Sequence, residues 1–426
     1  MKVLLINISR NWDGRVYSEY PLGIGIVGTI LKSAGYSVKI HDMSINQTPI
    51  EKVIELFNPN VVGLSFFSTS AYTAFETIKR LNNNKTYHLI AGGIHTSIYY
   101  EEVLKAGVDI AVIGESESTI LPLFSILEKV DYSNFHTKRN FQNISNIAFK
   151  ENNLAIHLNN ISKPIKDLDS LPFIERELYE LDKYTHHSIV TSRGCFHHCR
   201  FCSSQNLLGT TPRNFSINRI IQEIELLKEK FGKLRLYWAD DMFFYTHKDR
   251  IEFCNSLLKK NISIEYIVQL RADNINDELI NALKNTGCIK IAIGAESGSS
   301  QILKTIKKSI TIKQIEKAIT LSVNANLCIK TWWILGLPGE YKEQFKSLEL
   351  IKRTMPNEVA IHTFVPLPGS HFWNNPSSFG IKLPKNLLQL ENSYYSFPVH
   401  FEFEYLTKTQ LIGLINHYEE VLQLLN

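Results

Sequence analysis

The chain has 426 residues, of which 44% are hydrophobic and 21% are charged, and its formal net charge is +4. This is the composition of a globular protein, and the length is enough for two or three domains with large cores. The small net charge and the lack of a basic stretch interleaved with aromatic residues argue against a nucleic-acid surface, so we expect no nucleic acid partner.

The sequence also favours a protein of the cytoplasm. The longest apolar stretch, Pro21 to Leu31, is interrupted by three glycines and is too short to cross a bilayer, so no transmembrane segment is expected. The N-terminus turns polar after Ile6 and lacks the cleavage site of a signal peptide. Three of the six cysteines are scattered singly, which indicates core thiols in a reducing compartment; these are Cys254, Cys288 and Cys328.

Residues 1–130 alternate short apolar runs with segments of helical period. This alternation predicts an α/β unit with a parallel sheet covered by helices, hence a Rossmann-like domain whose ligands lie at the carboxyl ends of the strands. The expected strands are Lys2–Ile6, Ser37–Ile40, Val61–Ser65, His88–Ala91 and Asp109–Ile113.

Residues 131–186 break this pattern and are rich in asparagine and charged residues. A hairpin is expected over residues 146–158, turning on Glu151-Asn152-Asn153. We therefore predict a linker with a hairpin between two domains.

A second alternation covers residues 187–371. Six strand–helix units predict a partial (β/α)6 barrel, whose functional residues gather at the carboxyl ends of the strands. Residues 372–426 are rich in aromatic side chains and end in a helix-period segment, which predicts a small C-terminal α+β cap that either completes the core or faces substrate. The expected barrel strands are Ser188–Thr191, Leu234–Trp238, Ile264–Leu270, Ile289–Gly294, Cys328–Leu335 and Val359–Phe364.

The first half contains a G-x-G-x-x-G pattern formed by Gly23, Gly25 and Gly28, with Asp42 further on. This pattern occurs in dinucleotide-binding folds, where the first glycine directly follows a strand. Here a loop from Asn7 to Tyr20 intervenes. The position of the glycines therefore argues against NAD.

Three cysteines, Cys195, Cys199 and Cys202, lie within eight residues with the spacing C-x3-C-x2-C, after the first expected barrel strand. Three thiolates can bind three irons of a cubane cluster and leave the fourth iron open for chemistry. The alternatives are unrelated buried thiols or a structural zinc site completed by His197 or His198. Zinc usually takes two ligand pairs from separate segments, and a fourth ligand within this short loop would be strained.

The cysteine loop resembles that of the radical SAM superfamily. The resemblance implies a [4Fe–4S] cluster held by Cys195, Cys199 and Cys202, with S-adenosylmethionine (SAM) on the open iron. It also implies reductive cleavage of SAM to a 5'-deoxyadenosyl radical, which the protein positions and shields.

Later strand ends carry segments similar to the SAM-binding segments of that superfamily. An acidic rim suits the SAM ammonium, an arginine can fork its carboxylate, a glutamate can accept from the ribose, and glycine turns let the backbone approach adenine. Two alternatives stay open: an aspartate pair that caps the next helix, and an arginine and a glutamate that pair only with each other. The implied SAM residues are Asp240, Asp241, Gln269, Arg271, Glu296, Ser297, Ile334, Gly336 and Pro366.

The N-terminal half resembles the cobalamin-binding domain that precedes the barrel in one branch of the superfamily. Glycines would admit a flat corrin, hydroxyls would meet its amides, and side chains added at Gly93 or Gly114 should collide with the ring without disturbing folding. The D-x-H-x-x-G motif that offers a histidine to cobalt is absent, so His41 and His95 are expected to pack or face solvent. The implied cobalamin residues are Leu22, Gly23, Ser65, Ser68, Thr69, Gly92, Gly93, Gly114 and Glu115.

This resemblance implies a cobalamin-dependent radical SAM methyltransferase that uses two SAM per turnover, with methylcobalamin as methyl donor and the 5'-deoxyadenosyl radical for hydrogen abstraction. Its partners would be a small-molecule or natural-product intermediate as substrate and a flavodoxin or ferredoxin-type reductant. A radical cyclase or rearrangement enzyme with the same cofactors is one alternative. A non-catalytic cobalamin-binding protein with a vestigial barrel is another. A methylthiotransferase is disfavoured because no cysteine precedes Cys195.

Overall fold

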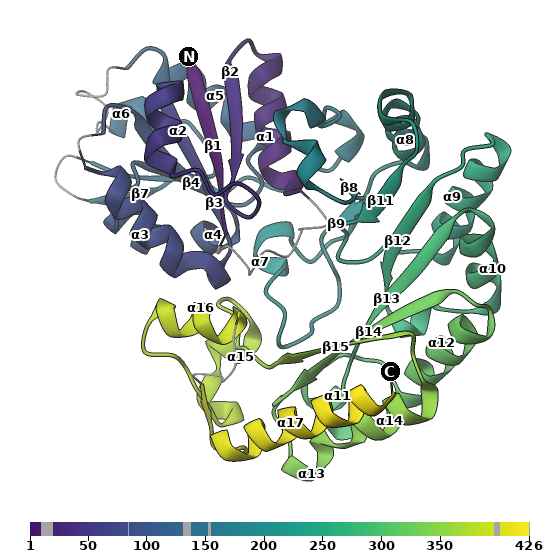
Figure 1. Ribbon diagram of the computed structural model, residues 1–426. Coiled ribbons are helices and arrows are strands. Elements are labelled where there is room, and N and C mark those ends of the chain that lie inside the picture. The colour runs from purple at the N-terminus through teal and green to yellow at the C-terminus, as the bar shows by residue number, and fades with distance from the viewer. Residues whose placement is uncertain (10–19, 84, 131–137, 152–154, 396–400, 426) are drawn as a thin grey trace. The chain divides into compact units, whose positions relative to one another are not determined.

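The computed structural model describes residues 1–9, 20–83, 85–130, 138–151, 155–395 and 401–425. The chain divides into two compact units, one of Met1–Thr185 with Ser204–Gly209 and one of His186–Ser203 with Thr210–Asn426 (Figure 1). Within the described residues, no helix is both long and apolar enough to cross a membrane.

A seven-stranded sheet forms the centre of the first unit, with the order β2-β1-β3-β4-β5-β6-β7. Strands β1 to β5 pair in parallel, as the alternation of the sequence predicts, so the Rossmann-like arrangement is confirmed. The apolar run of β1 is buried almost throughout, which is typical of a parallel strand covered on both faces. The bounds are β1 Lys2–Ile8, β2 Ser37–Asp42, β3 Val61–Phe66, β4 His88–Gly92 and β5 Ile110–Val112.

Helices connect these strands, and α1 and α5 share one hydrophobic core with β1. The helices of the first unit are α1 Leu22–Ser33, α2 Ile50–Phe57, α3 Ala71–Leu81, α4 Ile94–Lys105, α5 Glu117–Leu127, α6 Lys138–Phe141 and, from a later part of the chain, α7 Gln205–Leu208.

The expected hairpin is present as β6 (Ile147–Lys150) and β7 (Ile156–Leu158). It does more than join domains, because β6 pairs antiparallel with β5 and extends the central sheet. Of its expected turn, Asn152 and Asn153 lie outside the described residues. The structure therefore groups residues up to Thr185 with the first unit, where the sequence suggested a separate linker.

The G-x-G-x-x-G pattern lies inside α1, where two of its glycines, Gly25 and Gly28, serve packing. A Cβ at Gly25 would lie 2.2 Å from the Tyr179 hydroxyl, and one at Gly28 would lie 2.9 Å from the Leu178 side chain. Tyr179 also donates a hydrogen bond to the Pro21 carbonyl at 2.5 Å. Gly25 and Gly28 thus let a later segment dock on α1, which agrees with the argument against NAD.

The second unit is built on a six-stranded parallel sheet with the order β15-β14-β13-β12-β11-β8. This is the expected partial barrel. Its strands are β8 His187–Ile189, β11 Arg235–Trp238, β12 Glu265–Leu270, β13 Cys288–Glu296, β14 Cys328–Leu335 and β15 Glu358–Thr363, with a two-residue pair β9 Ser192–Arg193 and β10 Arg213–Asn214 beside them.

Several barrel helices begin where a Ser, Thr or Asn side chain accepts a hydrogen bond from the first turn. Thr311 and Gln314 form a full capping box at the start of α12. The helices are α8 Ile217–Phe231, α9 His247–Lys259, α10 Asp277–Asn285, α11 Ser300–Thr305, α12 Ile312–Asn324, α13 Tyr341–Gln344 and α14 Lys346–Thr354.

The C-terminal cap packs against the barrel core. Tyr418 donates a hydrogen bond to the Gln344 carbonyl at 2.5 Å, and Tyr405 donates one to the Gly336 carbonyl at 2.9 Å. The elements of the cap are α15 His371–Asn374, β16 Ile381–Lys382, α16 Leu387–Tyr395, β17 Glu402–Phe403 and α17 Lys408–Leu425.

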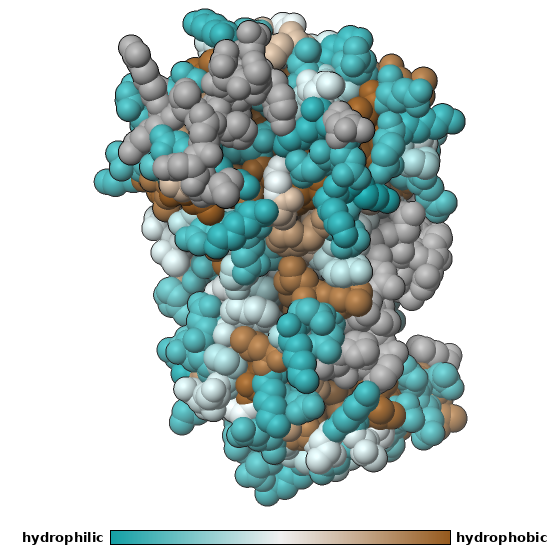
Figure 2. Space-filling view, turned by 90° about the vertical axis from the view of Figure 1, so that its left-hand side faces the viewer, coloured by the Kyte–Doolittle hydropathy of each residue, from teal (hydrophilic) through white to brown (hydrophobic). Residues whose placement is uncertain are grey.

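On the face shown in Figure 2, hydrophobic residues lie in small groups among hydrophilic ones.

The packing of α1 gives a test with a matched control. Gly25→Ala should lower the free energy of unfolding by about 1–3 kcal/mol, because its methyl group would displace the buried Tyr179. Gly23→Ala, on the same helix, would meet no atom within 4 Å and should be neutral or stabilising by up to about 1 kcal/mol. Chemical denaturation of both variants measures the difference, and equal stabilities would contradict the packing role.

Candidate functional site

The loop that follows β8 carries Cys195, Cys199 and Cys202, all partly buried. Its middle is anchored at Arg200, whose backbone N–H donates to the Ile306 carbonyl at 2.9 Å and whose guanidinium donates to the Thr305 carbonyl at 2.8 Å. The three thiols therefore lie on a loop that is tied to the end of α11.

Two opposite effects act on the thiol of Cys199. Burial raises the pKa of Cys199, and the nearby Lys308 ammonium acts in the opposite direction. Burial is also the main cause that lowers the pKa of His197 to about 4, so this imidazole is neutral at physiological pH. Among the described residues no three His, Cys, Asp or Glu side chains converge as a metal site, so the cluster ligands stay a prediction from the loop and its donor set.

The two aspartates in the loop after β11, Asp240 and Asp241, differ in exposure. Asp240 is 4% exposed, and its carboxylate accepts hydrogen bonds from the backbone N–H groups of Thr191 at 2.6 Å and Ser192 at 3.0 Å. Asp241 is exposed. The helix cap of α9 is Thr246, so the alternative that this aspartate pair caps the next helix is wrong.

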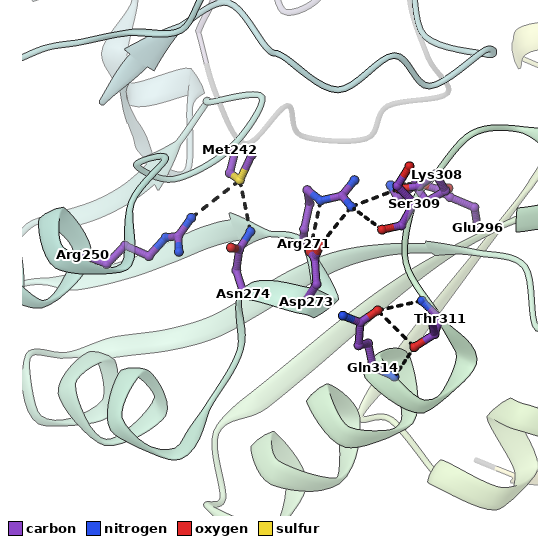
Figure 3. A network of polar contacts seen from close by, with 10 residues as sticks. All are labelled: Met242, Arg250, Arg271, Asp273, Asn274, Glu296, Lys308, Ser309, Thr311 and Gln314. Carbon is purple, nitrogen blue, oxygen red and sulfur yellow. Dashed lines mark hydrogen bonds and ion pairs between the residues drawn. The ribbon is translucent and has the colours of Figure 1, made fainter. Parts of the chain in front are cut away.

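The ends of β12 and β13 meet through a lysine that the sequence did not indicate (Figure 3). Lys308 Nζ donates to Glu296 Oε1 at 2.7 Å, and the Lys308 carbonyl accepts from Arg271 Nη2 at 3.0 Å. Arg271 also donates two hydrogen bonds to the Asp273 carboxylate, from Nε to Oδ1 at 3.1 Å and from Nη2 to Oδ2 at 3.0 Å. Arg271 and Glu296 therefore both bond to Lys308, through its carbonyl and its ammonium respectively, which excludes the alternative that they pair only with each other.

Lys308 also connects this corner to the cysteine loop. Its Nζ lies 5.8 Å from the centre of the Phe201 ring, and Phe201 directly precedes Cys202. The local signal for Lys308 is weak, because a lysine after a short helix is common. The lysine is significant only because it is 8% exposed and paired with Glu296.

Glu296 has an uncommon backbone conformation, with φ of +61°. A non-glycine residue in this region is strained, and such strain often accompanies a functional turn. The next residue, Ser297, is buried, and its hydroxyl accepts from the Ser299 N–H at 3.1 Å. The turn is thus held by its own hydrogen bonds.

The other residues with an expected SAM role lie at the ends of three strands. Gln269, on β12, donates to the Tyr237 hydroxyl. Ile334 is partly buried on β14, and Pro366 is buried after β15. Gly336 has φ of +83°, and its N–H donates to Gln344 at 3.1 Å, so this turn is covered by protein.

The first unit has two glycine turns at the carboxyl ends of β4 and β5. Gly93 has φ of +91°, and a Cβ there would lie 3.1 Å from the Phe66 carbonyl oxygen, so the expectation that a side chain at Gly93 leaves folding undisturbed is wrong. Gly114 has φ of +70° and open space where a Cβ would lie. Ser97 joins the turns by donating to the Gly93 carbonyl and accepting from the Gly114 N–H, both at 2.9 Å. The open turn at Gly114, with Gly92 nearby on β4, fits a flat ligand such as a corrin.

The hydroxyls expected to meet the corrin are mostly buried. Ser68 and Thr69 are 6% and 9% exposed, and Ser68 Oγ lies 3.0 Å from His95 Nδ1. Ser65 is partly buried beside Gly93. What this loop presents outward is the ring of Phe67, which is 62% exposed.

The two histidines pack inside the unit, as expected. His95 is fully buried, and burial lowers its pKa to about 4. His41 is 2% exposed, and burial lowers its pKa as well.

Three remaining cobalamin assignments lie outside these turns. Leu22 and Gly23 belong to the first turn of α1. A carboxylate oxygen of Glu115 accepts from the Ile165 N–H at 3.1 Å, so this side chain also anchors the later segment of the unit.

Comparison with known proteins agrees with this division of the chain. Residues 15–123 match the family described as B12 binding domain, and residues 189–350 match the Radical SAM superfamily.

Relatives extend over nearly the whole chain. The uncharacterized methyltransferase PH0819 of Pyrococcus horikoshii is 27% identical over 379 residues, which are 86% of this chain and 80% of that protein. The anaerobic magnesium-protoporphyrin IX monomethyl ester cyclase of Rubrivivax gelatinosus is 25% identical over 374 residues, which are 83% of this chain and 64% of the cyclase.

A solved structure shares the fold. The radical S-adenosylmethionine methyltransferase TsrM of Kitasatospora setae, with cobalamin and a [4Fe–4S] cluster bound, superposes with a TM-score of 0.74 at 15% identity, over 90% of this chain and 79% of that one. The two family matches, in this order on one chain, identify the protein as a radical SAM enzyme of the branch in which a cobalamin-binding domain precedes the barrel.

Proposed function

We propose that the protein is a cobalamin-dependent radical SAM methyltransferase that acts on a small molecule. The observation that carries the proposal is the three-cysteine loop at the head of the barrel in a chain that also has a B12-binding domain. Methyltransferases among the similar proteins favour methyl transfer over other uses of the same cofactors.

The chain's own residues would bind and orient the cofactors. Cys195, Cys199 and Cys202 would hold the cluster, and the exposed Asp241 would accept from the SAM ammonium. Glu296, pre-oriented by Lys308, would accept from the ribose hydroxyls, while Arg271 would face the SAM carboxylate. When bound, the cluster supplies reductive cleavage of SAM and cobalamin supplies a carrier for the methyl group.

The overall reaction fixes the product ratio. Two SAM cations, two electrons and a substrate R–H give R–CH3, S-adenosylhomocysteine, methionine and 5'-deoxyadenosine, because the substrate hydrogen leaves on the deoxyadenosyl carbon. We propose that a flavodoxin or ferredoxin-type protein delivers the electrons. A reducing, cytoplasmic setting is supported by the unpaired, buried Cys254 and Cys288.

Labelled SAM tests the reaction type. Anaerobically reconstituted protein, given deuterated-methyl SAM, hydroxocobalamin and a metabolite extract, should add one labelled methyl group to a product and release S-adenosylhomocysteine and 5'-deoxyadenosine in equal amounts. Cys199→Ala should form no 5'-deoxyadenosine, because the cluster loses a ligand. Mass spectrometry reads both products. A product with altered mass and no label would favour the cyclase or rearrangement alternative, which the Rubrivivax relative supports.

The Glu296–Lys308 pair tests the SAM site. Lys308→Met should lower stability, because it leaves the Glu296 carboxylate buried without its partner. The double variant with Glu296→Gln should recover stability but still bind SAM roughly tenfold more weakly, since a neutral amide oxygen accepts from the ribose hydroxyls more weakly than a carboxylate does.

The control for this pair is Lys307→Met, which changes the neighbouring, exposed lysine and should leave both properties unchanged. Melting temperature and titration calorimetry with SAM, on protein of equal iron content, separate the two effects. Wild-type SAM affinity in the double variant would show that the pair serves only the fold.

Gly114 tests cobalamin binding. Gly114→Asn keeps a residue that tolerates positive φ but fills the open space, so bound cobalamin should be largely lost while the fold survives. Gly35→Asn is the control, because Gly35 also has positive φ and open space where a Cβ would lie. It lies in the turn before β2, at the amino-terminal ends of the strands, whereas Gly114 lies at their carboxyl ends. Corrin absorbance after gel filtration with hydroxocobalamin measures retention. Equal retention in both variants would remove Gly114 from the site.

A further inference from the structure

The loop between β11 and α9, residues 239–246, holds the segment that leads into the cysteine loop. The buried Asp240 carboxylate accepts from two successive backbone N–H groups, those of Thr191 and Ser192, and from the Thr191 hydroxyl at 3.1 Å. Both carboxylate oxygens are therefore engaged inside the protein. Cys195 follows this segment by only three residues.

Three further hydrogen bonds join the same two segments. The Phe244 N–H donates to the Thr191 hydroxyl at 3.0 Å, and the Ser192 hydroxyl donates to the Met242 carbonyl at 3.3 Å. The Tyr245 hydroxyl donates to the carbonyl of Gly194, the residue directly before Cys195.

Arg250, on α9, is only 1% exposed and binds the backbone of this loop. Its guanidinium donates to the carbonyls of Phe243 at 2.9 Å, Phe244 at 2.6 Å and Tyr245 at 3.3 Å. It also lies 3.6 Å from the Met242 sulfur, which contacts Asn274 on its other side (Figure 3). A buried guanidinium that donates hydrogen bonds to successive carbonyls fixes the shape of a loop, because each carbonyl must point at the same planar group.

We infer that Asp240, Tyr245 and Arg250 are positioning residues for the iron–sulfur loop, acting through residues 191–194. Asp240 holds the start of that loop, and Arg250 holds the loop that carries Asp240. This role replaces the SAM contact expected for Asp240, and it rests on the proposed cluster at Cys195, Cys199 and Cys202. Groups that orient metal ligands in this way commonly change metal retention by about 10–100-fold when they are removed.

Iron retention in the anaerobically reconstituted full chain tests this inference. Asp240→Asn puts an NH2 group in place of the oxygen that accepts from the Thr191 hydroxyl and leaves a weaker, neutral acceptor for the two backbone N–H groups. Tyr245→Phe removes only the hydroxyl on the Gly194 carbonyl, and Arg250→Met removes the donors to the β11 loop. Each variant should lose iron to a chelator at least about tenfold faster than wild type, and the electron paramagnetic resonance spectrum of its reduced cluster should change.

The matched control is Arg235→Met at the other end of β11, where the arginine is exposed and pairs with Glu265 at 3.0 Å. It should leave iron release and spectrum unchanged. Wild-type iron release and spectra in Asp240→Asn and Tyr245→Phe would overturn the inference, even if their melting temperatures fall. If Asp240→Asn does not fold, Tyr245→Phe decides alone. Wild-type protein that takes up no iron would instead overturn the proposed function.

Discussion

Parallel pairing of the strands is the constraint on which both candidate sites depend. In the second unit all six strands of the main sheet run the same way, so the segment after each strand emerges at one edge. Arg271 and Glu296, at the ends of neighbouring strands, thereby reach the same Lys308. In the first unit the same rule brings the turns at Gly93 and Gly114 within reach of Ser97. Each site is thus formed by the segments that follow the carboxyl ends of neighbouring parallel strands.

At the carboxyl ends of the barrel strands, buried ionisable groups have internal partners. Glu296 is paired with Lys308, Arg271 forks Asp273, and Asp240 accepts from backbone N–H groups. Burial raises the pKa of Asp240 to about 8, although the hydrogen bonds from Thr191 and Ser192 act in the opposite direction. The charged form of this carboxyl group is therefore destabilised by its burial. Such groups are worth burying when they fix the direction of a loop that must hold a cofactor.

Glycine serves three different purposes in the first unit. Gly25 and Gly28 lie in a helix and make room for the segment around Tyr179. Gly93 has positive φ and close backbone neighbours, whereas Gly114 has positive φ and open space in front of it. A motif search sees one residue type in all four positions. The difference between packing, turning and admitting a ligand depends on what lies opposite each glycine.

The sequence by itself determined the two α/β units, the order of their strands along the chain and the three-cysteine loop, because hydrophobic period and cysteine spacing are local properties of the chain. The strand bounds of β14 agree with the sequence to the residue. Only the tertiary structure decided that the hairpin joins the first sheet, that Lys308 completes the corner of Arg271 and Glu296, and that Phe67 is exposed while Ser68 turns inward. It also turned Asp240 away from solvent and left Asp241 exposed. These outcomes depend on which strands and loops become neighbours, and the partner that a polar side chain finds is set by that neighbourhood.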